Sequence, residues 1–347
     1  SDIRKKMTVR KGKIRRMRWW SFGASVAGVL LILGVGIMLW MKPEENGVWE
    51  GEKTVEPGIG QVVLTLGDGE SMPLKRDTNR LIFGGTMLQV RNERGTLVYS
   101  KIKSKEASEK IVYNTLTVPV RERFQLVLAD GTKVFLNSGS EMRYPERFGK
   151  ARREVFLKGE AWFEVAKDSA REFWVHAGAM DVKVLGTSFN VKAYERLETV
   201  ATTLVEGSVE VACAGKSFQI VPGEQFVYDK NNRVMDVRMV DTESYVSWKD
   251  GYYKFRQTTL EEIMETLSVW YGLNVFYVNE SAKQVEFTGK VKRYEDARML
   301  LDKFEQTGDV VFDIKGNNVF ITIKQKKPFA REWNSFLVKA RGMVWQS

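Results

Sequence analysis

Side chains that could carry out acid-base, metal or thiol chemistry are scarce in this sequence. Histidine and cysteine occur once each, as His176 and Cys213, among 347 residues. A zinc site, a Ser-His-Asp triad or a Cys-His dyad needs several such groups close together, and a disulfide framework needs paired cysteines. His176 lies in an apolar, strand-like run, so we expect a structural histidine. The composition therefore predicts no metal site, no cofactor and no enzyme of these classes.

Carboxylate chemistry would need an acidic pair in a pocket, and no pair stands out from ordinary surface charge. Asp130-Gly131-Thr132 could be mistaken for a ligand-binding loop. A two-residue hairpin turn, however, requires a positive φ at glycine and favours an aspartate that caps it, and these residues supply both. We expect a turn there, and turn or strand-edge residues at Gly159-Glu160-Ala161-Trp162 and Pro222-Gly223-Glu224-Gln225. Core positions are expected for the strand aromatics Phe163, Phe173, Trp174 and Phe189.

The N-terminal region joins a basic segment to a long apolar run. Residues 1–18 hold nine Lys or Arg against one Asp, so they carry +8 of the formal net charge of +10. Residues 19–41 contain no charge and, as a helix, would extend about 34 Å against a hydrocarbon core of about 30 Å. This run is longer than the apolar part of a cleaved signal peptide, about 7–15 residues. We predict a transmembrane helix over 19–41.

The basic segment 1–18 sets the orientation of that helix. Cationic residues next to a membrane helix remain on the cytoplasmic side, where they contact anionic lipid. Everything after residue 42 is therefore expected on the opposite side of the membrane. Nucleic-acid binding is not expected, because no basic face with interleaved aromatic residues recurs in the rest of the chain.

Residues 42–58 are rich in Pro, Gly and Glu and read as a linker, and residues 59–248 read as a β-rich domain. Short strand-like runs in this domain are separated by turn dipeptides, which indicates antiparallel, hairpin-rich structure. LTLGDGESMPL at 64–74 aligns with LVLADGTKVFL at 126–136, so both segments are predicted hairpins of one architecture.

Residues 249–325 change to a mixed pattern and predict an α+β module of tandem βαβ units. Thr258 and Glu261 form a capping box before apolar residues at helical spacing, and the helix is expected to end at Gly272. A second strand and helix follow, and then two strands around residues 316–318. Such units can bury their helices on one small sheet. The tail 326–347 is expected to be an amphipathic surface segment or a disordered extension, of unknown role.

Several motifs of the β-rich domain occur together in a recognisable order. Residues 126–148 (LVLADGTKVFLNSGSEMRYPERF) combine a DGT turn, a Leu-Asn pair, a Ser and a Tyr-Pro pair. They are followed by RREVFLKGEAWFEV (152–165), VKVLGTSFNVKAY (182–194), TTLVEGSVEV (202–211) and VPGEQ (221–225). This pattern resembles the FecR family of transmembrane regulators and anti-sigma factors over nearly all of 115–325. Residues 247–325 resemble the C-terminal module of Bacteroidetes members, which is similar to the short N-terminal domain of secretins and TonB-dependent transducers.

The resemblance implies a mechanism and a location. In this family an outer-membrane TonB-dependent transducer contacts the periplasmic part of the regulator through its signalling domain. The signal then crosses the bacterial inner membrane to a cytoplasmic extracytoplasmic-function (ECF) sigma factor. By resemblance, this chain is a single-pass inner-membrane protein with a cytoplasmic N-terminus and a periplasmic C-terminus, and it acts through protein contacts and regulated proteolysis. The resemblance implies no cofactor, no nucleic acid and no small-molecule substrate.

The C-terminal module is the docking surface that the resemblance implies, because small sheets of this kind can pair edges with a similar domain. We expect the contact at exposed strands near Phe255 and at Val285, Glu286, Phe287 and Thr288. The alternative is a membrane-anchored periplasmic carbohydrate or cell-wall binding module, which the many aromatic residues in strands would permit. Co-purification with a receptor's periplasmic domain and saturable glycan binding distinguish the two functions.

The resemblance also singles out one site for covalent chemistry, the Gly186–Thr187 bond. Some family members resemble self-cleaving proteins in which a Thr hydroxyl attacks the preceding Gly carbonyl. Glycine is small enough to let the hydroxyl reach that carbonyl on a strained turn, and the ester that forms would hydrolyse. The other interpretation is a tight turn between strands. Beyond this bond the chain is not expected to be an enzyme.

The N-terminal region departs from the family pattern. Members of the family usually carry a sigma-binding domain before the membrane helix, whereas here 18 residues precede Trp19. The first residue is Ser1, which favours a truncated chain. We therefore interpret residues 1–18 as the remnant of a sigma-binding region.

Overall fold

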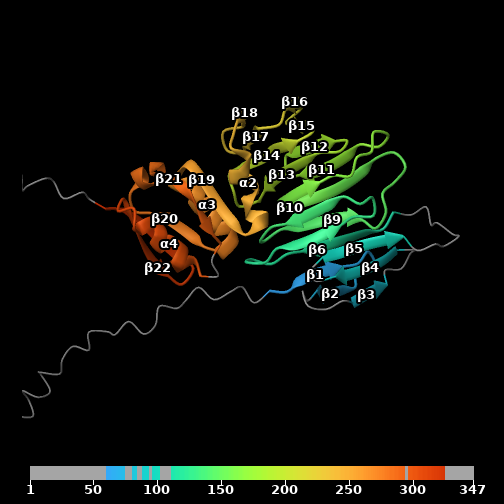
Figure 1. Cartoon of the computed structure of the whole chain (residues 1–347), viewed down its shortest axis with the longest axis horizontal. Helices are drawn as coiled ribbons and strands as arrows, with labels where there is room; N and C mark the ends of the chain where they lie inside the picture. The colour runs from blue at the N-terminus through green and yellow to red at the C-terminus, as the bar shows by residue number, and fades with distance from the viewer. Residues whose placement is uncertain are drawn as a thin grey trace, which may run out of the picture. The chain divides into compact units, whose positions relative to one another are not determined.

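Two large β-sheets and a smaller α+β module form the described part of the chain (Figure 1). The computed structural model describes residues 60–74, 80–83, 88–93, 96–101, 111–293 and 296–324. The predicted basic segment, transmembrane helix, linker and tail (1–18, 19–41, 42–58 and 326–347) lie outside these residues. No helix within the described ranges has the length and apolar character needed to cross a bilayer.

The first sheet, sheet A, has the strand order β2-β1-β6-β9-β10-β11-β12-β15-β16. Its neighbours pair antiparallel except for β10 and β11, which are parallel. Chain neighbours mostly pair with each other here, as hairpin-rich sequence predicts. The strands other than β10 are β1 Val62–Thr65, β2 Ser71–Leu74, β6 Tyr113–Thr117, β9 Glu141–Pro145, β11 Phe173–Ala177, β12 Met180–Val184, β15 Val209–Cys213 and β16 Lys216–Ile220.

The second sheet, sheet B, has the order β3-β4-β5-β7-β8-β10-β13-β14-β17-β18, with β5 and β7 parallel. We call β1 to β18 the β-domain. The remaining strands of sheet B are β3 Arg80–Phe83, β4 Leu88–Glu93, β5 Thr96–Lys101, β7 Phe124–Val127, β8 Lys133–Leu136, β13 Ser188–Ala193, β14 Thr199–Glu206, β17 Glu224–Asp229 and β18 Val234–Met239.

Strand β10, Arg153–Glu164, belongs to both sheets. Its first half pairs with β9 and β11 in sheet A, and its second half, from Gly159 onward, pairs with β13 in sheet B. Gly159 has φ +107°, and a Cβ atom there would lie 2.5 Å from Ser140 Oγ. The prediction of a turn at Gly159 was therefore wrong, because glycine here lets one continuous strand pass from one sheet to the other.

The two hairpins of the internal repeat are confirmed. Strands β1 and β2 pair around Asp68-Gly69, and β7 and β8 pair around Asp130-Gly131. Both glycines have positive φ, +94° and +89°. At the second turn, Asp130 Oδ1 accepts from the Thr132 amide at 3.0 Å, and Oδ2 accepts from the buried Arg153 guanidinium at 2.8 Å. The turn is therefore structural, as predicted.

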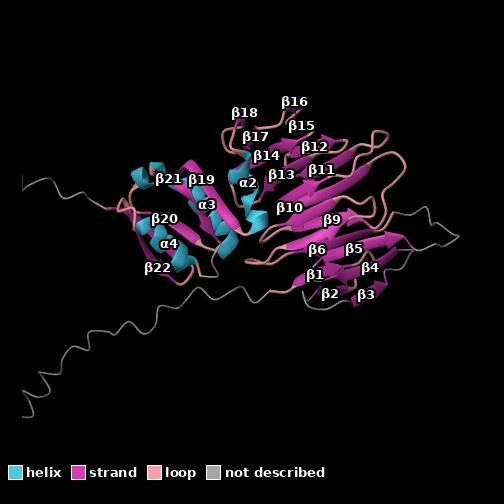
Figure 2. Cartoon of the chain, viewed as in Figure 1, coloured by secondary structure: helices cyan, strands magenta, loops and turns pink. Residues whose placement is uncertain are grey.

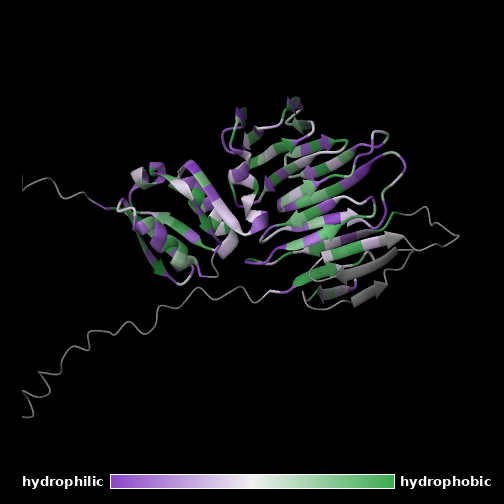
Figure 3. Ribbon diagram, viewed as in Figure 1, coloured by the Kyte–Doolittle hydropathy of each residue, from purple (hydrophilic) through white to green (hydrophobic). Residues whose placement is uncertain are grey.

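Hydrophobic and hydrophilic residues alternate along many of the strands (Figure 3). The buried hydrophobic side chains of sheets A and B form one core. Phe163, Phe173 and Phe189 are fully buried there, as predicted. Trp174 was predicted in the core as well, but it lies on the outer face of sheet A, stacked 6.3 Å from the His176 ring. The one-residue alternation places Phe173 inside and Trp174 outside.

A connector, made of α2 and η1, joins the β-domain to the C-terminal module (Figure 2). We define the C-terminal module as β19 to β23 with α3 and α4. Strands β19 and β21 form an antiparallel pair, whereas β20, β23 and β22 form a separate three-stranded sheet. The elements are α2 Thr242–Val246, η1 Ser247–Asp250, β19 Tyr252–Thr259, α3 Leu260–Tyr271, β20 Asn274–Tyr277, η2 Glu280–Gln284, β21 Glu286–Lys292, α4 Ala297–Glu305, β22 Val310–Lys315 and β23 Asn318–Ile323.

The structure corrects two predictions for this module. Two sheets replace the one small sheet that was expected, because the strands before and after each helix do not pair with each other. The N-cap of α3 is Thr259 and not Thr258: its Oγ1 accepts from the Glu262 amide at 3.3 Å. Gly272 ends the helix in the left-handed conformation, as predicted.

Candidate functional site

The outer face of sheet B is covered by the C-terminal module and the connector. In a strand covered on one face only, every second residue is buried. In β14, five consecutive residues, Val200 to Leu204, are buried, so both faces of this strand are covered. Val200 and Leu204 belong to the core between the sheets. On the opposite side of sheet B, Trp162 is part of the apolar core of the C-terminal module. We call this contact between sheet B and the module the junction.

A buried carboxylate, Glu160, lies at the centre of the junction. It is 7% exposed, and it accepts hydrogen bonds from two amide side chains of neighbouring strands or loops. Asn137 Nδ2 donates to Oε2 at 2.7 Å, and Asn190 Nδ2 donates to Oε1 at 2.9 Å. Since each amide gives its NH2 group to Glu160, its carbonyl oxygen must face away from it. Glu160 therefore fixes the orientation of both asparagines.

Those two carbonyl oxygens bind the module and the connector. Arg293, just after β21, donates from NH2 to Asn137 Oδ1 at 3.0 Å, and Trp248 of the connector donates from Nε1 to Asn190 Oδ1 at 3.3 Å. The guanidinium of Arg293 also lies 3.3 Å from the centre of the Trp270 ring. Such a stacked, hydrogen-bonded arginine has a defined position. We call Asn137, Glu160, Asn190, Trp248 and Arg293 the junction clamp.

A second set of contacts holds the C-terminal end of α3. Ser138 Oγ lies 3.1 Å from the Val269 carbonyl oxygen and 3.3 Å from that of Trp270, and it donates to this pair. Arg121 donates to the Tyr271 carbonyl oxygen at 3.3 Å. The last carbonyl groups of a helix lack partners within the helix and carry partial negative charge, so a hydroxyl and a cation are suitable partners. Burial lowers the pKa of Arg121.

A buried tyrosine and a serine support the clamp from within the β-domain. Tyr194 donates to the Ser138 carbonyl oxygen at 2.7 Å. Ser140 Oγ accepts from the Glu160 amide at 2.8 Å and donates to the Glu160 carbonyl oxygen at 3.0 Å. Burial raises the pKa of Tyr194 well above its ordinary value, so this phenol stays a neutral donor. The backbone around Glu160 is therefore held on both sides.

The residues predicted to dock a partner divide into two groups. Phe255 and Phe287 are each 7% exposed, and both rings contact Phe304 of α4 in the core of the module. Glu286 and Thr288 are exposed, as alternation along β21 requires. Val285, half-buried, immediately precedes β21. The two aromatic rings therefore hold the strands in place, and only the alternate side chains and the strand edge face outward.

Leu185, Gly186 and Thr187 lie between β12 and β13. A Cβ atom on Gly186 would lie 2.6 Å from Lys167 Cγ, and one on Gly207 would lie 2.8 Å from Thr187 Oγ1. Thr187 Oγ1 donates to the Ser208 carbonyl oxygen at 3.0 Å. Thr187 is therefore buried against a segment in which a glycine leaves room for its hydroxyl.

His176 and Cys213, the two residues with the most reactive side-chain types, occupy structural positions. His176 Nδ1 lies 2.7 Å from Asp181 Oδ1, and its ring stacks 4.8 Å from that of Phe156. Cys213 is buried, and burial raises the pKa of its thiol. Within the described ranges, no group of three His, Cys, Asp or Glu side chains is placed to hold a metal ion.

The sequence reasoning did not find the junction clamp. Asn137 lies in the motif LNSGS and Glu160 in GEAW, which were interpreted as family markers and turn residues. Arg293 follows 156 positions after Asn137, so no local pattern connects the two. The sequence does hold one signal for the clamp. Asn137, Glu160 and Asn190 occur next to strand residues that must be buried, and buried polar groups need hydrogen-bond partners.

Comparison with known proteins gives two family matches and a structural match. Residues 114–210 match the family described as FecR protein, and residues 252–321 match the family described as FecR, C-terminal. The chain is also similar to a protein from Parabacteroides distasonis that is assigned as an anti-sigma factor, in crystal structures at 1.65 and 2.50 Å resolution. Both structures show 27% identity and a TM-score of 0.56. The match to the 1.65 Å structure covers 61% of this chain and 99% of the Parabacteroides chain, and the match to the 2.50 Å structure covers 62% and 100%. No curated protein matches.

Proposed function

The chain belongs to the FecR family of anti-sigma regulators, and from this premise we propose that it relays a signal from an outer-membrane TonB-dependent transducer to a cytoplasmic ECF sigma factor. Two domains in the family's order, and a structural relative assigned as an anti-sigma factor, support the regulatory role. The predicted helix over 19–41 would place both domains in the periplasm and the N-terminus in the cytoplasm of a bacterial inner-membrane protein.

The junction clamp is the observation that carries this proposal. A regulator of this kind must pass a change at its docking module to the domain that precedes it. Here the two are connected by hydrogen bonds from Arg293 and Trp248 to side chains that Glu160 orients. Buried polar contacts of this kind are either all formed or lost together, because a half-broken set leaves unsatisfied groups. Partner binding that displaces the module would therefore open the junction as one event.

We propose that the partner adds a β-strand to the pair β19 and β21. Among the strands that the structure describes, β19 and β21 pair only with each other, so each has one edge without a strand partner, which is the condition for strand addition. The exposed side chains Glu286 and Thr288 stand next to that edge on β21. Phe255 and Phe287, buried beneath it, would act indirectly by holding the two strands in register.

The docking proposal is tested with the double variant E286K/T288K in the full chain. Both side chains lie outside the core, but the Thr288 hydroxyl accepts from the Gln257 amide at 2.9 Å, so the melting temperature is expected to fall slightly. Thr288→Val loses the same hydrogen bond without added charge, and its affinity for the partner is expected to match that of the wild type. Binding to the periplasmic signalling domain of the transducer is expected to fall at least tenfold, which corresponds to about 1.4 kcal/mol. E195K/Q219K, at two exposed positions of the β-domain, makes the same change of net charge and is the matched control.

Two results would contradict the docking proposal. Unchanged affinity of the double variant would remove β21 from the contact. Equal losses for E286K/T288K and for E195K/Q219K would mean that added positive charge, and not its position, weakens binding. A loss confined to E286K/T288K supports strand addition at β21.

A further inference from the structure

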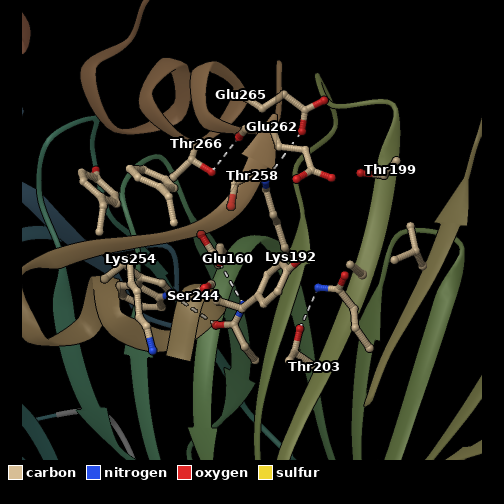
Figure 4. A pocket seen from close by; sticks show the side chains of 18 of the residues that line it. Glu160, Lys192, Thr199, Thr203, Ser244, Lys254, Thr258, Glu262, Glu265 and Thr266 are labelled. Carbon is tan, nitrogen blue, oxygen red and sulfur yellow. Dashed lines mark hydrogen bonds and ion pairs between the residues drawn. The ribbon is translucent and has the colours of Figure 1, made fainter. Parts of the chain in front are cut away.

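A cavity of about 190 Å³ lies within the junction, beside the clamp (Figure 4). Its floor is the outer face of sheet B, with Thr203 and Gln225 from β14 and β17. Its roof is formed by α3 and β19, with Glu262 and Glu265 of α3 facing inward. A cavity of about 150 Å³ accommodates a benzene-sized ring, so this one has room for a six-membered sugar ring.

The floor of the cavity is polar, although it is buried. Thr203 and Gln225 are 1% and 3% exposed, and the Gln225 amide donates to Thr203 Oγ1 at 2.9 Å. An ordinary contact between a sheet and a covering module buries apolar side chains, and Trp162 is an example at this junction. Buried polar side chains are expected to have partners, and those that face an open volume can complete their hydrogen bonds with water or with a guest molecule.

One hydroxyl in the lining of the cavity lacks a hydrogen-bond partner. Ser244 Oγ of α2 is shielded from solvent and has no hydrogen-bond partner in the described part of the chain. The two ion pairs across the cavity are long: Lys192 Nζ lies 3.8 Å from Glu265 Oε2, and Arg238 NH2 lies 3.8 Å from Glu262 Oε1. A guest hydroxyl could bond to groups on both sides of these gaps, because a hydroxyl donates and accepts.

The charges around the cavity indicate a neutral guest. Three acidic side chains and three basic ones line it, so neither an anion nor a cation is favoured by net charge. They are Glu160, Glu262, Glu265, Lys192, Arg238 and Lys254. Aromatic rings of the connector and β19, including Trp248 and Tyr253, line the same volume. Rings beside amide, hydroxyl and carboxylate groups suit a molecule with apolar C–H faces and many hydroxyls.

We propose that this cavity binds a single neutral sugar ring, which bridges sheet B and α3. This site is separate from the partner contact on β21 and does not depend on it. A guest that contacts both walls binds the closed junction better than an open one, so it shifts the equilibrium toward the closed form. The sugar would thus stabilise the attachment of the C-terminal module to the β-domain.

The experiment measures binding of D-glucose and N-acetyl-D-glucosamine to the detergent-solubilised full chain, by calorimetry and by the shift in melting temperature. Ser244→Ala removes a buried hydroxyl that has no protein partner, so the melting temperature without sugar is not expected to fall, whereas the affinity for sugar is expected to fall about tenfold. Ala201→Phe places a ring in the cavity and is expected to abolish binding. Glu195→Gln, at an exposed position, is the matched control.

The two variants show whether a sugar binds in this cavity or elsewhere. Saturable binding of either sugar that Ser244→Ala weakens and Ala201→Phe abolishes supports the site. Absence of heat and of any melting shift with both sugars at millimolar concentration overturns the proposal and leaves a cavity filled by water. Binding that both variants retain also overturns it, because the sugar then binds elsewhere. If Ala201→Phe does not fold, the Ser244→Ala result decides alone.

Discussion

Replacing Glu160 by Gln tests the junction clamp with the smallest change of shape. The carboxylate accepts one hydrogen bond at each oxygen, 2.7 Å from Asn137 Nδ2 and 2.9 Å from Asn190 Nδ2. Glutamine has one oxygen and one NH2 group, so one asparagine would face a donor in place of an acceptor. That asparagine cannot rotate by 180° without turning its own donor toward Arg293 or Trp248.

The expected cost follows from this conflict. One buried donor left without an acceptor costs about 1–3 kcal/mol in the free energy of unfolding. For a domain of about 150–250 residues, a change of 2 kcal/mol lowers the melting temperature by about 4–8 °C. The loss should be local as well: amide exchange of residues 248–252 and 268–273, which lie at the junction, is expected to accelerate more than that of the β-domain core.

The assay is thermal unfolding of the detergent-solubilised full chain, followed by hydrogen exchange on peptides that cover the junction. Glu195→Gln is the control, since that side chain is 80% exposed and makes only an exposed ion pair with Lys158. We expect no measurable change for the control. A Glu160→Gln variant as stable as the wild type, with unchanged exchange at the junction, would refute the clamp.

Three further predictions concern single residues. Gly159→Ala places a methyl group 2.5 Å from Ser140 Oγ at φ +107°, so the variant is expected to lose about 3 kcal/mol or more by denaturant unfolding. Burial raises the pKa of Glu265, so the folded chain binds a proton at this carboxyl more readily than the unfolded chain. The free energy of unfolding is therefore expected to fall as the pH rises above the ordinary pKa range of a carboxyl group. Glu265→Gln should flatten this part of a curve of stability against pH and should raise stability at neutral pH. Self-cleavage at the Gly186–Thr187 bond would proceed by acyl transfer from the Thr187 nitrogen to its hydroxyl, followed by hydrolysis of the ester. If it occurs, wild-type protein will run as two fragments on a denaturing gel, and Thr187→Ala will run as one band. Identical single bands for both proteins would end that hypothesis.

Local features of this chain could be predicted from its sequence. The hairpins around Gly69 and Gly131 and the end of α3 at Gly272 each depend on a glycine and its immediate neighbours. The capping residue of α3 was missed by one position, because Thr258 and Thr259 are adjacent and both can cap. Features set by long-range contact could not be predicted in this way.

Gly159 illustrates the limit. In the sequence, a glycine between two strand-like runs indicates a turn. In the structure, strand β10 passes at this glycine from sheet A to sheet B, which lie on opposite sides of the core. The separation of the module into two sheets depends likewise on which strands pair, and not on where strands occur. The clamp depends on residues from both domains that meet only after both have folded.

The most direct test of the proposed relay is recovery of the native protein from membranes of its own cells, through a tag at the C-terminus, with identification of the bound proteins by mass spectrometry. We expect to recover an ECF sigma factor together with a TonB-dependent transducer, and we expect the E286K/T288K variant to lose the transducer alone. Recovery of the protein with neither partner, from cells that express both, would contradict the account.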